Sequence, residues 1–400
     1  MDTPEPAGAD GEFDVASPLF AELFDLAVPQ PKYRALLAAG EVHRPSESFV
    51  VVASRNAAEA TLRDSARFSA EGLLDLGNIR PLIPLSVDPP GHVKYRKILD
   101  PLFAPKRMEA LEDDITGRVN HFIDAFADRG ECHFTNEFAV LFPSSVFLGL
   151  MGLPWEELDT LLRLKDGIMR PAADPADAES AARIRRETGT EIYAYFEAIL
   201  DERERQPRDD ILSQFLTFEI DGEKLTREEI LDICFLFLIA GLDTVTDTLT
   251  CSFAYLGAHP EHRRQLVDDP ALIPAAVEEL LRWETPVPNV LRMATGDTEL
   301  GGCPVAAGSF IAVSLGAANV DEAEFPDAFD VRFDRETNRH LAFGGGVHRC
   351  LGSHLARREL RVALREWHRR IPEYEVKHGI ELHYPTGLRS VENLELVWPV

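Results

Sequence analysis

A run of three glycines just before a cysteine is the strongest chemical signal in this 400-residue chain. The segment is Phe343-Gly-Gly-Gly-Val-His-Arg, and Cys350 then begins a predicted helix. Glycines let the backbone come close to a flat, bulky group. A helix amino terminus favours a thiolate over a thiol. The segment therefore predicts a thiolate beside a planar ligand.

Three chemistries could use this cysteine. With His340, His348 and His354 it could form a zinc site, because imidazole and thiolate are common zinc ligands. A catalytic Cys–His pair is the second possibility. The third is a single thiolate bound to a haem iron, which also explains the glycine run and the lack of other ligand clusters. The other cysteines are expected to be small hydrophobes in the core: Cys132, Cys234, Cys251 and Cys303.

A long helix is predicted from Thr226 to about Ala258. Thr226 and Glu229 form a capping-box pattern, and the middle of the helix is apolar on all sides. Such a helix crosses the interior of a large domain, so Asp243 and Thr244 are expected to be buried polar residues halfway along it. A Thr hydroxyl there can bond to the carbonyl four residues earlier and bend or open the helix.

These segments resemble the motifs of the cytochrome P450 family. Phe343-x-x-Gly346-x-x-x-Cys350-x-Gly352 is similar to the family's haem-binding loop, and Ala240-Gly-Leu-Asp-Thr244 to its oxygen-binding segment. Two further motifs occur in the family's order, which are Glu279-x-x-Arg282 and, after Asp88, His92-x-x-x-Arg96. The helix pattern is similar to that of soluble bacterial members, including the camphor-hydroxylating type.

The resemblance implies a mainly α fold with a minor β portion, as a single triangular cytochrome P450-type domain around a buried haem b. We expect this domain at residues 16–400, after a flexible segment at 1–15. Short β-branched runs predict the minor sheet at Phe49–Ala53, Ser309–Leu315 and Leu394–Trp398, with a turn at Asp221-Gly222.

The resemblance also implies roles for single residues. Cys350 is implied as the iron ligand, with Phe343 packed near the sulfur. Thr244 and Asp243 are implied as the catalytic pair, in which a notch beside Gly241 holds dioxygen and a water while Asp243 gates the proton supply. The cofactor contacts are expected at His92, Arg96, Gly241, Arg292, Phe343, His348, Cys350 and Gly352.

Glu279 and Arg282 are expected to be a buried scaffold for the haem loop rather than catalytic residues. Many family members add an arginine just before a Phe-Asp pair, whereas this chain has Ala328 at that position. Arg332 and Arg335 are both candidates for the missing third member.

Composition excludes several classes of partner. The chain has 68 acidic against 41 basic residues, a formal charge of −27, so a nucleic-acid backbone or an anionic membrane surface would repel it. No apolar run approaches the ~20 residues of a membrane-spanning helix. The acidic first residues do not resemble a signal peptide. We therefore expect a cytoplasmic protein with no nucleic-acid partner and no membrane insertion.

The substrate is expected to be an apolar small molecule of the terpenoid, steroid or branched fatty-acid class. In family members, the segment that matches the Leu- and Ile-rich residues 73–85 covers the pocket. Val290 and Leu291 would reach in from the opposite side, with Asn289 or Arg80 as a polar anchor.

Electrons are expected from a separate ferredoxin and its NAD(P)H-dependent ferredoxin reductase, because the chain has no flavin or iron–sulfur motif. Residues 344–370 carry seven arginines and two glutamates. Arg349, Arg358 and Arg361 are expected to help dock an acidic ferredoxin. Two alternatives stay open, a peroxide-driven peroxygenase and a non-catalytic haem sensor, although Asp243-Thr244 argues against both.

Overall fold

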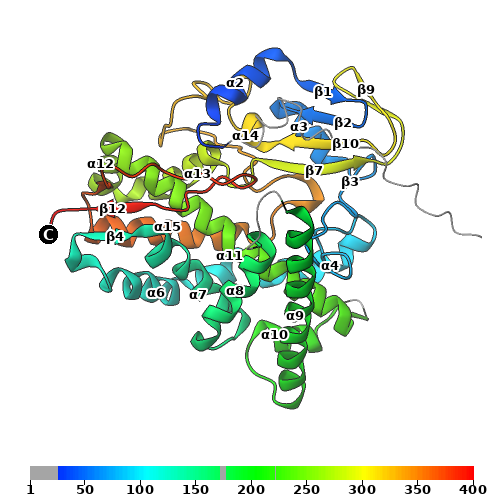
Figure 1. The fold of residues 1–400 in the computed structure, drawn as a ribbon, viewed down its shortest axis with the longest axis horizontal. Coiled ribbons are helices and arrows are strands. Elements are labelled where there is room, and N and C mark those ends of the chain that lie inside the picture. Colours follow the sequence, from blue (N-terminus) through cyan, green and yellow to red (C-terminus); the bar gives the residue numbers. More distant parts are fainter. Residues whose placement is uncertain (1–25, 172–176, 221) are drawn as a thin grey trace, which may run out of the picture.

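The computed structural model describes residues 26–171, 177–220 and 222–400. The segment expected to be flexible, residues 1–15, lies outside the described residues. Figure 1 shows a mainly helical body with a strand-rich layer along one edge. The expected fold class, mainly α with a minor β portion, is confirmed. Within the described ranges, no helix is both long and apolar enough to cross a membrane.

The long predicted helix is α11 (Arg227–Ala258), which runs through the middle of the helical body (Figure 1). Its capping box is present. The Glu229 N–H donates to the Thr226 hydroxyl, and the Glu229 carboxylate accepts from the Thr226 N–H at 2.7 Å. The helices that pack against α11 include α7 (Leu141–Met151), α8 (Leu158–Met169), α9 (Ala178–Arg205), α13 (Ile273–Glu284) and α15 (Ser353–Arg370).

Two separate apolar cores meet along α11. Residues 230–242 belong to a core shared with α8 and α9. From Val245 onward, the helix belongs to a second core, shared with α6 (Glu112–Asp124), α13 and α15. Asp243 and Thr244 lie at the boundary between these cores. The middle of α11 is therefore where a polar group is tolerated best, because neither core closes over it completely.

The strand-rich layer is a five-stranded sheet. Its order is β1 (Val42–Ser46), β2 (Phe49–Val52), β10 (Phe310–Ser314), β7 (Asn289–Ala294) and β3 (Phe68–Ser69). β10 pairs in parallel with β2 and antiparallel with β7. The strands predicted at Phe49–Ala53 and Ser309–Leu315 are thus β2 and β10. This sheet carries Arg292 on β7.

Smaller sheets complete the β portion. The third predicted strand is β12 (Glu395–Val397), which pairs with β4 (Glu131–His133) and β11 (Glu375–Val376). β5 (Glu219–Ile220) and β6 (Glu223–Lys224) pair on either side of the predicted turn, and β8 (Thr298–Leu300) pairs with β9 (Cys303–Val305). The other α-helices are α2 (Gln30–Ala39), α3 (Arg55–Arg63), α4 (Gly91–Leu99), α5 (Pro105–Glu109), α10 (Ile211–Thr217), α12 (Pro260–Asp268) and α14 (Leu315–Ala318).

Candidate active site

The loop that leads to Cys350 is closed by its own backbone. The Cys350 N–H donates to the Phe343 carbonyl at 2.9 Å, across a short helical turn at Gly346–His348. The expectation that Cys350 begins a helix is wrong, because α15 begins at Ser353 and Cys350 lies in the turn before it. The cysteine therefore depends on the loop as well as on the helix for its position.

Gly346 is required by a contact with protein backbone. Its φ is 64°, and a Cβ at this position would collide with the carbonyl oxygen of Leu62 in α3. A Cβ on Gly344 or Gly352 would meet no atom within 4 Å. Gly346 is therefore also needed to seat the loop against α3, and the interpretation that the glycines admit a flat group stays a prediction.

Cys350 differs from the other cysteines in its surroundings. Cys132, Cys234 and Cys251 are buried as expected, and Cys303 is half-buried, whereas Cys350 is exposed. Nearby protein atoms desolvate the thiol and raise its pKa, while the Gly352 N–H and nearby arginine charges lower it. An N–H donor and cations around an accessible sulfur suit a thiolate that ligates a metal ion.

The middle of α11 presents a second accessible surface inside the fold. Most of the helix is buried, yet Ala240 and Gly241 are exposed and Thr244 is half-exposed. The expectation that Thr244 is buried is therefore wrong. Its hydroxyl donates to the Ala240 carbonyl at 3.3 Å, and α11 stays continuous there, without the predicted opening. Close contact with the Phe147 ring leaves little room for a side chain at Gly241.

Asp243 points away from this surface into an ionic cluster with α8. Its Oδ1 lies 2.9 Å from Lys165 Nζ, and Arg170 Nη1 lies 3.1 Å from both carboxylate oxygens. Lys165 and Asp243 are buried, whereas Arg170 is partly exposed and also reaches Glu392 at 3.4 Å. Asp243 is thus connected to solvent through Arg170, while its helix neighbour Thr244 faces the interior surface.

Lys165 and Arg170 are functional candidates that the sequence analysis missed. Lys165 lies among Leu158, Leu161, Leu164 and Ile168, which form the buried face of α8. A lysine at the spacing of buried leucines was an available signal, because a buried lysine needs an acidic partner. Its partner, 78 residues further along the chain, could not be inferred from α8 alone.

Three of the predicted cofactor contacts gather beside α4 and β7. The rings of His92 and His348 are 4.6 Å apart, and Arg292 is close enough to lower the pKa of His348. Burial lowers the pKa of His92 to about 4 and also lowers those of His348 and Arg292. Asp88 orients His348, whose Nε2 lies 3.0 Å from Oδ1 of Asp88.

The same group has buried nitrogen atoms that lack a hydrogen-bond partner among the described residues. Nε2 of His92 and Nδ1 of His348 are buried without a hydrogen-bond partner. Arg292 is buried, and the one acceptor that it contacts in the described structure is the Leu291 carbonyl, at 2.7 Å from Nη1. Buried donors of this kind indicate an anionic acceptor. A haem propionate has that chemistry, so these residues fit the group that the cysteine loop implies.

Arg96 lies against the cysteine loop itself. Its Nη1 donates to the Arg349 carbonyl at 2.7 Å, and its Nε donates to Asp100 at 2.7 Å. Phe343 is also at this loop, with the Arg357 guanidinium 4.4 Å from its ring centroid. Arg96 therefore holds the residue before Cys350, while Phe343 joins the start of the loop to Arg357 of α15.

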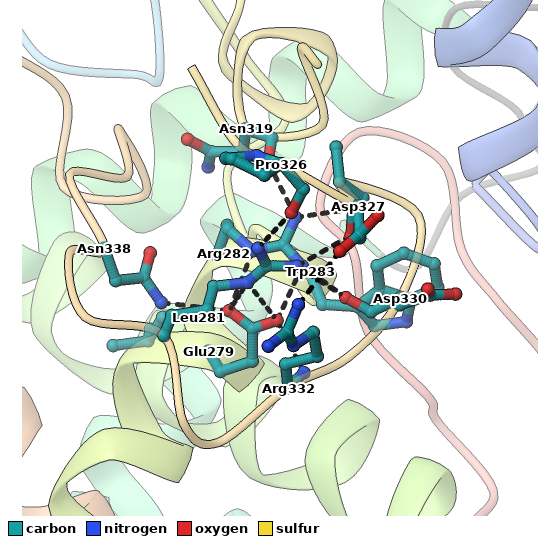
Figure 2. A network of polar contacts seen from close by, with 12 residues as sticks. Glu279, Leu281, Arg282, Trp283, Asn319, Pro326, Asp327, Asp330, Arg332 and Asn338 are labelled. Atoms are coloured by element: carbon teal, nitrogen blue, oxygen red, sulfur yellow. Dashed lines mark hydrogen bonds and ion pairs between the residues drawn. The ribbon is translucent and has the colours of Figure 1, made fainter. Parts of the chain in front are cut away.

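The Glu279–Arg282 pair is buried at the centre of a network that Figure 2 shows. Burial disfavours the Glu279 carboxylate, but Arg282 and further donors outweigh it and lower its pKa. Nε of Arg335 lies 2.9 Å from Oε1 of Glu279, whereas the Arg332 side chain binds Asp327 and Asp334. Arg335 is therefore the third member, and Arg332 adds its backbone N–H at 2.9 Å.

This network ties together several segments that precede the loop of Cys350 in the chain. Arg282 donates to the carbonyls of Asn319, Ala328 and Asp330, and Asn338 donates to Glu279 at 3.0 Å. The Asn319 side chain in turn accepts from the Leu341 N–H at 2.6 Å, two residues before Phe343. The pair is structural, as expected, because it holds the chain that enters the loop.

The zinc interpretation finds no support in the described part of the chain. His340 pairs with Glu278 at 3.1 Å, while His348 pairs with Asp88. No three His, Cys, Asp or Glu side chains of the described residues form a group that could hold a metal ion. Cys350 thus offers a single sulfur ligand, which suits haem iron and not a four-ligand zinc site.

The segment expected to cover the pocket is fastened to α9 and α11. Arg80 Nε lies 3.0 Å from both Asp232 oxygens, and the Tyr193 hydroxyl donates to the same carboxylate at 3.0 Å. A Cβ on Gly77 would collide with the Arg185 carbonyl, so this backbone lies directly on α9. Arg80 therefore holds the covering segment through Nε, while its Nη2 is buried without a hydrogen-bond partner, and its role as a polar substrate anchor stays a prediction.

The start of β7 divides its side chains between two faces. Val290 packs against the same apolar core as Ala294. Side chains alternate between the two faces of a strand, so Arg292 lies on the same face as Val290 and Ala294. Leu291 packs in a different core, and alternation places Asn289 on that side. Val290 therefore shares the face of the cation group, whereas Leu291 packs in another core and its expected pocket position is wrong. Both polar side-chain atoms of Asn289 are buried without a hydrogen-bond partner, and its role as a polar anchor stays a prediction.

Comparisons with known proteins agree with this site. The cytochrome P450 family model matches residues 169–370. A probable cytochrome P450 127A1 of Sinorhizobium fredii is 34% identical over 342 residues, or 84% of this chain and 80% of the relative. The steroid C26-monooxygenase of Mycolicibacterium smegmatis is 33% identical over 346 residues, with 85% of each chain covered.

A solved structure has the same fold. CYP109E1 of Bacillus megaterium in complex with testosterone superposes with a TM-score of 0.86 at 26% identity, covering 95% of this chain and 99% of that one. The chain thus has both the sequence similarity and the fold of these proteins. The loop of Cys350, the accessible surface of α11 and the buried cations lie on that fold. The chain belongs to the cytochrome P450 family of haem-iron monooxygenases.

Proposed function

We propose that this monooxygenase binds haem b through Cys350 and inserts one oxygen atom from O2 into an apolar small molecule. One observation carries the proposal, namely that two interior surfaces are accessible in an otherwise packed fold. One is at Cys350 and the other is at Ala240, Gly241 and Thr244. These accessible residues would hold the haem, with Cys350 as the iron ligand.

The cofactor residues are proposed from the unpartnered donors. Arg292, His92 and His348 would hold the propionates, and Arg96 would steady the loop beside them. When bound, the haem iron supplies the activation of dioxygen, which the protein's side chains cannot provide. Gly352, which has open space beside it, would leave room near the iron ligand.

Thr244 and Asp243 are proposed to deliver protons to the reacting oxygen. The Thr244 hydroxyl faces the accessible surface of α11, where it can hydrogen-bond to oxygen or water. Asp243, the residue before Thr244, forms an ion pair with the partly exposed Arg170. A proton path requires an accessible hydroxyl next to a carboxylate that is linked to solvent, and Asp243 has that link through Arg170.

A steroid-sized substrate has the most support among the expected classes. The relative from M. smegmatis is named a steroid C26-monooxygenase, and the solved neighbour contains testosterone. Leu82 and Ile83 in the covering segment are buried in an apolar core with α9 and α11. Terpenoids and branched fatty acids share the apolar character and are the next substrates to test.

Electron supply is proposed to come from a ferredoxin and an NAD(P)H-dependent ferredoxin reductase. The arginines of α15 support this less strongly than their number suggests. Arg358 pairs with Glu112, and Arg357 and Arg361 pair with Glu278. Arg349 is exposed beside Cys350 and makes no side-chain pair among the described residues. Docking is therefore proposed to centre on Arg349 and the partly exposed Arg361.

The cytoplasmic location stays a prediction.

The test begins with the carbon monoxide difference spectrum of the reduced, haem-loaded protein. A red-shifted thiolate-type band is expected, and a colourless protein that binds zinc would contradict the proposal. Steroids, terpenoids and branched fatty acids are then titrated for a shift of the haem spectrum towards high spin. Sugars and nucleotides serve as controls, and a screen that returned only polar binders would refute the apolar substrate.

The electron donor is tested by the rate of reduction with ferredoxin at rising ionic strength. Arg361→Gln should slow the reaction at low salt, while Arg183→Gln on α9 serves as the matched control. A rate that depends on neither salt nor Arg361 would place docking elsewhere. Turnover with hydrogen peroxide but not with reduced ferredoxin would favour the peroxygenase alternative, and spectral binding without turnover the sensor.

A further inference from the structure

Asp247 is a buried carboxyl group that the proposed mechanism does not use. It lies one helical turn after Asp243 on the same face of α11, and its exposed fraction is 0%. Neither of its carboxylate oxygens has a hydrogen-bond partner. An ionised carboxylate without a partner is costly in such a place, so the group needs either a cation or a proton.

The nearby cations are already engaged by other carboxylates. On α8, Lys165 binds Asp243 at 2.9 Å and Asp166 at 2.9 Å, and Arg170 binds Asp243 at 3.1 Å. From the carboxyl-terminal segment, Glu392 reaches Arg170 at 3.4 Å. The hydroxyl of Ser390, which is also buried, lies close enough to favour the ionised form of Asp247, although it makes no hydrogen bond of normal geometry to it.

The charges around Asp247 therefore favour its protonated form. Burial raises the pKa of Asp247 to about 8 and the negative charge of Asp243 adds to the shift, while Ser390, Arg170 and Lys165 oppose it. At neutral pH, Asp247 is thus mostly a neutral acid beside an ion cluster. Its ionisation would add a second negative charge whose field acts on the same two cations.

We propose that Asp247 is a positioning residue that controls how tightly Lys165 and Arg170 hold Asp243. While Asp247 keeps its proton, both cations bind Asp243 and restrain it. When Asp247 releases its proton to solvent, it attracts the same cations and frees Asp243 to exchange protons. This inference rests on the proposed proton-delivery role of Asp243 and extends it to regulation by pH.

The first experiment measures the proton directly, in the haem-loaded protein. Infrared difference spectra between wild type and Asp247→Asn should contain the carbonyl stretch of one protonated, buried carboxyl group at about pH 6. The band should disappear as the pH rises through about 8. Asp166→Asn, which changes the exposed carboxylate of the same cluster, should leave the band in place. Absence of the band from wild type at about pH 6 would overturn the inference.

Stability provides a second readout that does not depend on activity. The folded-state pKa is raised, so the unfolded chain releases this proton at lower pH than the folded protein does. The melting temperature of wild type should therefore fall relative to that of Asp247→Asn as the pH rises from about 4 to about 8. Above about pH 8, the difference between the two melting temperatures should stay constant. Equal pH profiles for the two proteins would contradict the inference.

The third experiment tests the consequence for the reaction. Oxygen consumption by wild type should rise as the pH passes through about 8, and Asp247→Asn should remove this step while Asp166→Asn keeps it. A step that persists in Asp247→Asn would overturn the inference alone. If Asp243→Asn left oxygen consumption unchanged, the proposed role of Asp243 would fail as well, whatever the infrared band showed.

Discussion

Nζ of Lys165 lies 2.9 Å from Oδ1 of Asp243, and the two side chains are only 4% and 2% exposed. A buried ion pair is weak evidence for stability, because desolvation offsets much of the attraction. It does fix where the Asp243 side chain points, which is away from the accessible surface of α11. The backbone of Asp243 thus links an ionic cluster on one side of the helix to the Thr244 hydroxyl on the other.

Asp243→Asn is expected to slow oxygen consumption by on the order of 10²-fold, because a positioned acid–base group typically contributes that much. The amide keeps the shape of the side chain but cannot exchange protons. Oxygen uptake with saturating ferredoxin and substrate measures the effect. A normal rate in a correctly folded, haem-loaded variant would contradict the proposed proton path.

Thr244→Ala is expected to uncouple the reaction. NAD(P)H and oxygen are still consumed, but the oxygen emerges mainly as hydrogen peroxide because proton delivery loses its hydrogen-bond partner. Thr248→Ala is a matched control one turn further along α11, where the hydroxyl donates to the Thr244 carbonyl at 2.7 Å. Product and peroxide formed per reductant are measured for both. Equal coupling in the two variants would show that the Thr244 hydroxyl has no special role.

Cys350→His is expected to bind haem but to lose monooxygenation. A neutral imidazole supplies less electron density to the iron than a thiolate does. The carbon monoxide difference spectrum should lose its red-shifted band while the haem content stays measurable. Retention of normal hydroxylation would refute the assignment of Cys350 as the ligand.

Arg335→Ala is expected to lower the free energy of unfolding by about 1.5–3 kcal/mol, the usual effect of losing a hydrogen bond to a buried charge. Arg335 is 7% exposed and binds both Glu279 oxygens. Arg332→Ala is the control. That side chain is 43% exposed and makes surface pairs worth about 0–1 kcal/mol. Urea unfolding compares the two, and equal losses would place Arg335 outside the network.

Gly346→Ala is expected to destabilise the protein more than Gly344→Ala does. Both glycines have positive φ, 64° and 65°, so both substitutions carry a backbone strain of roughly 1–2 kcal/mol. Gly346 also lies against the Leu62 carbonyl, whereas Gly344 has open space. Thermal unfolding and haem retention measure the difference. Similar values for both variants would show that the contact with α3 does not matter.

The sequence by itself determined those features that one element encodes. The loop before Cys350, the capping box of Thr226 and Glu229 and the long apolar helix are local patterns, since the residues that define each lie close together in the chain. The family resemblance added the Glu279–Arg282 pair and the cation candidates, because its motifs recur at recognisable spacing. The fold class and the type of reaction could therefore be predicted from the sequence alone.

Only the tertiary structure decided which side chains meet across the fold. Arg332 and Arg335 are three residues apart and chemically alike, yet the path of the loop brings just the second guanidinium to Glu279. Asp243 receives its cations from α8, more than 70 residues away in the chain. Gly346 likewise serves a contact with α3. Such pairings depend on how helices pack against one another, and no pattern within a single element records that.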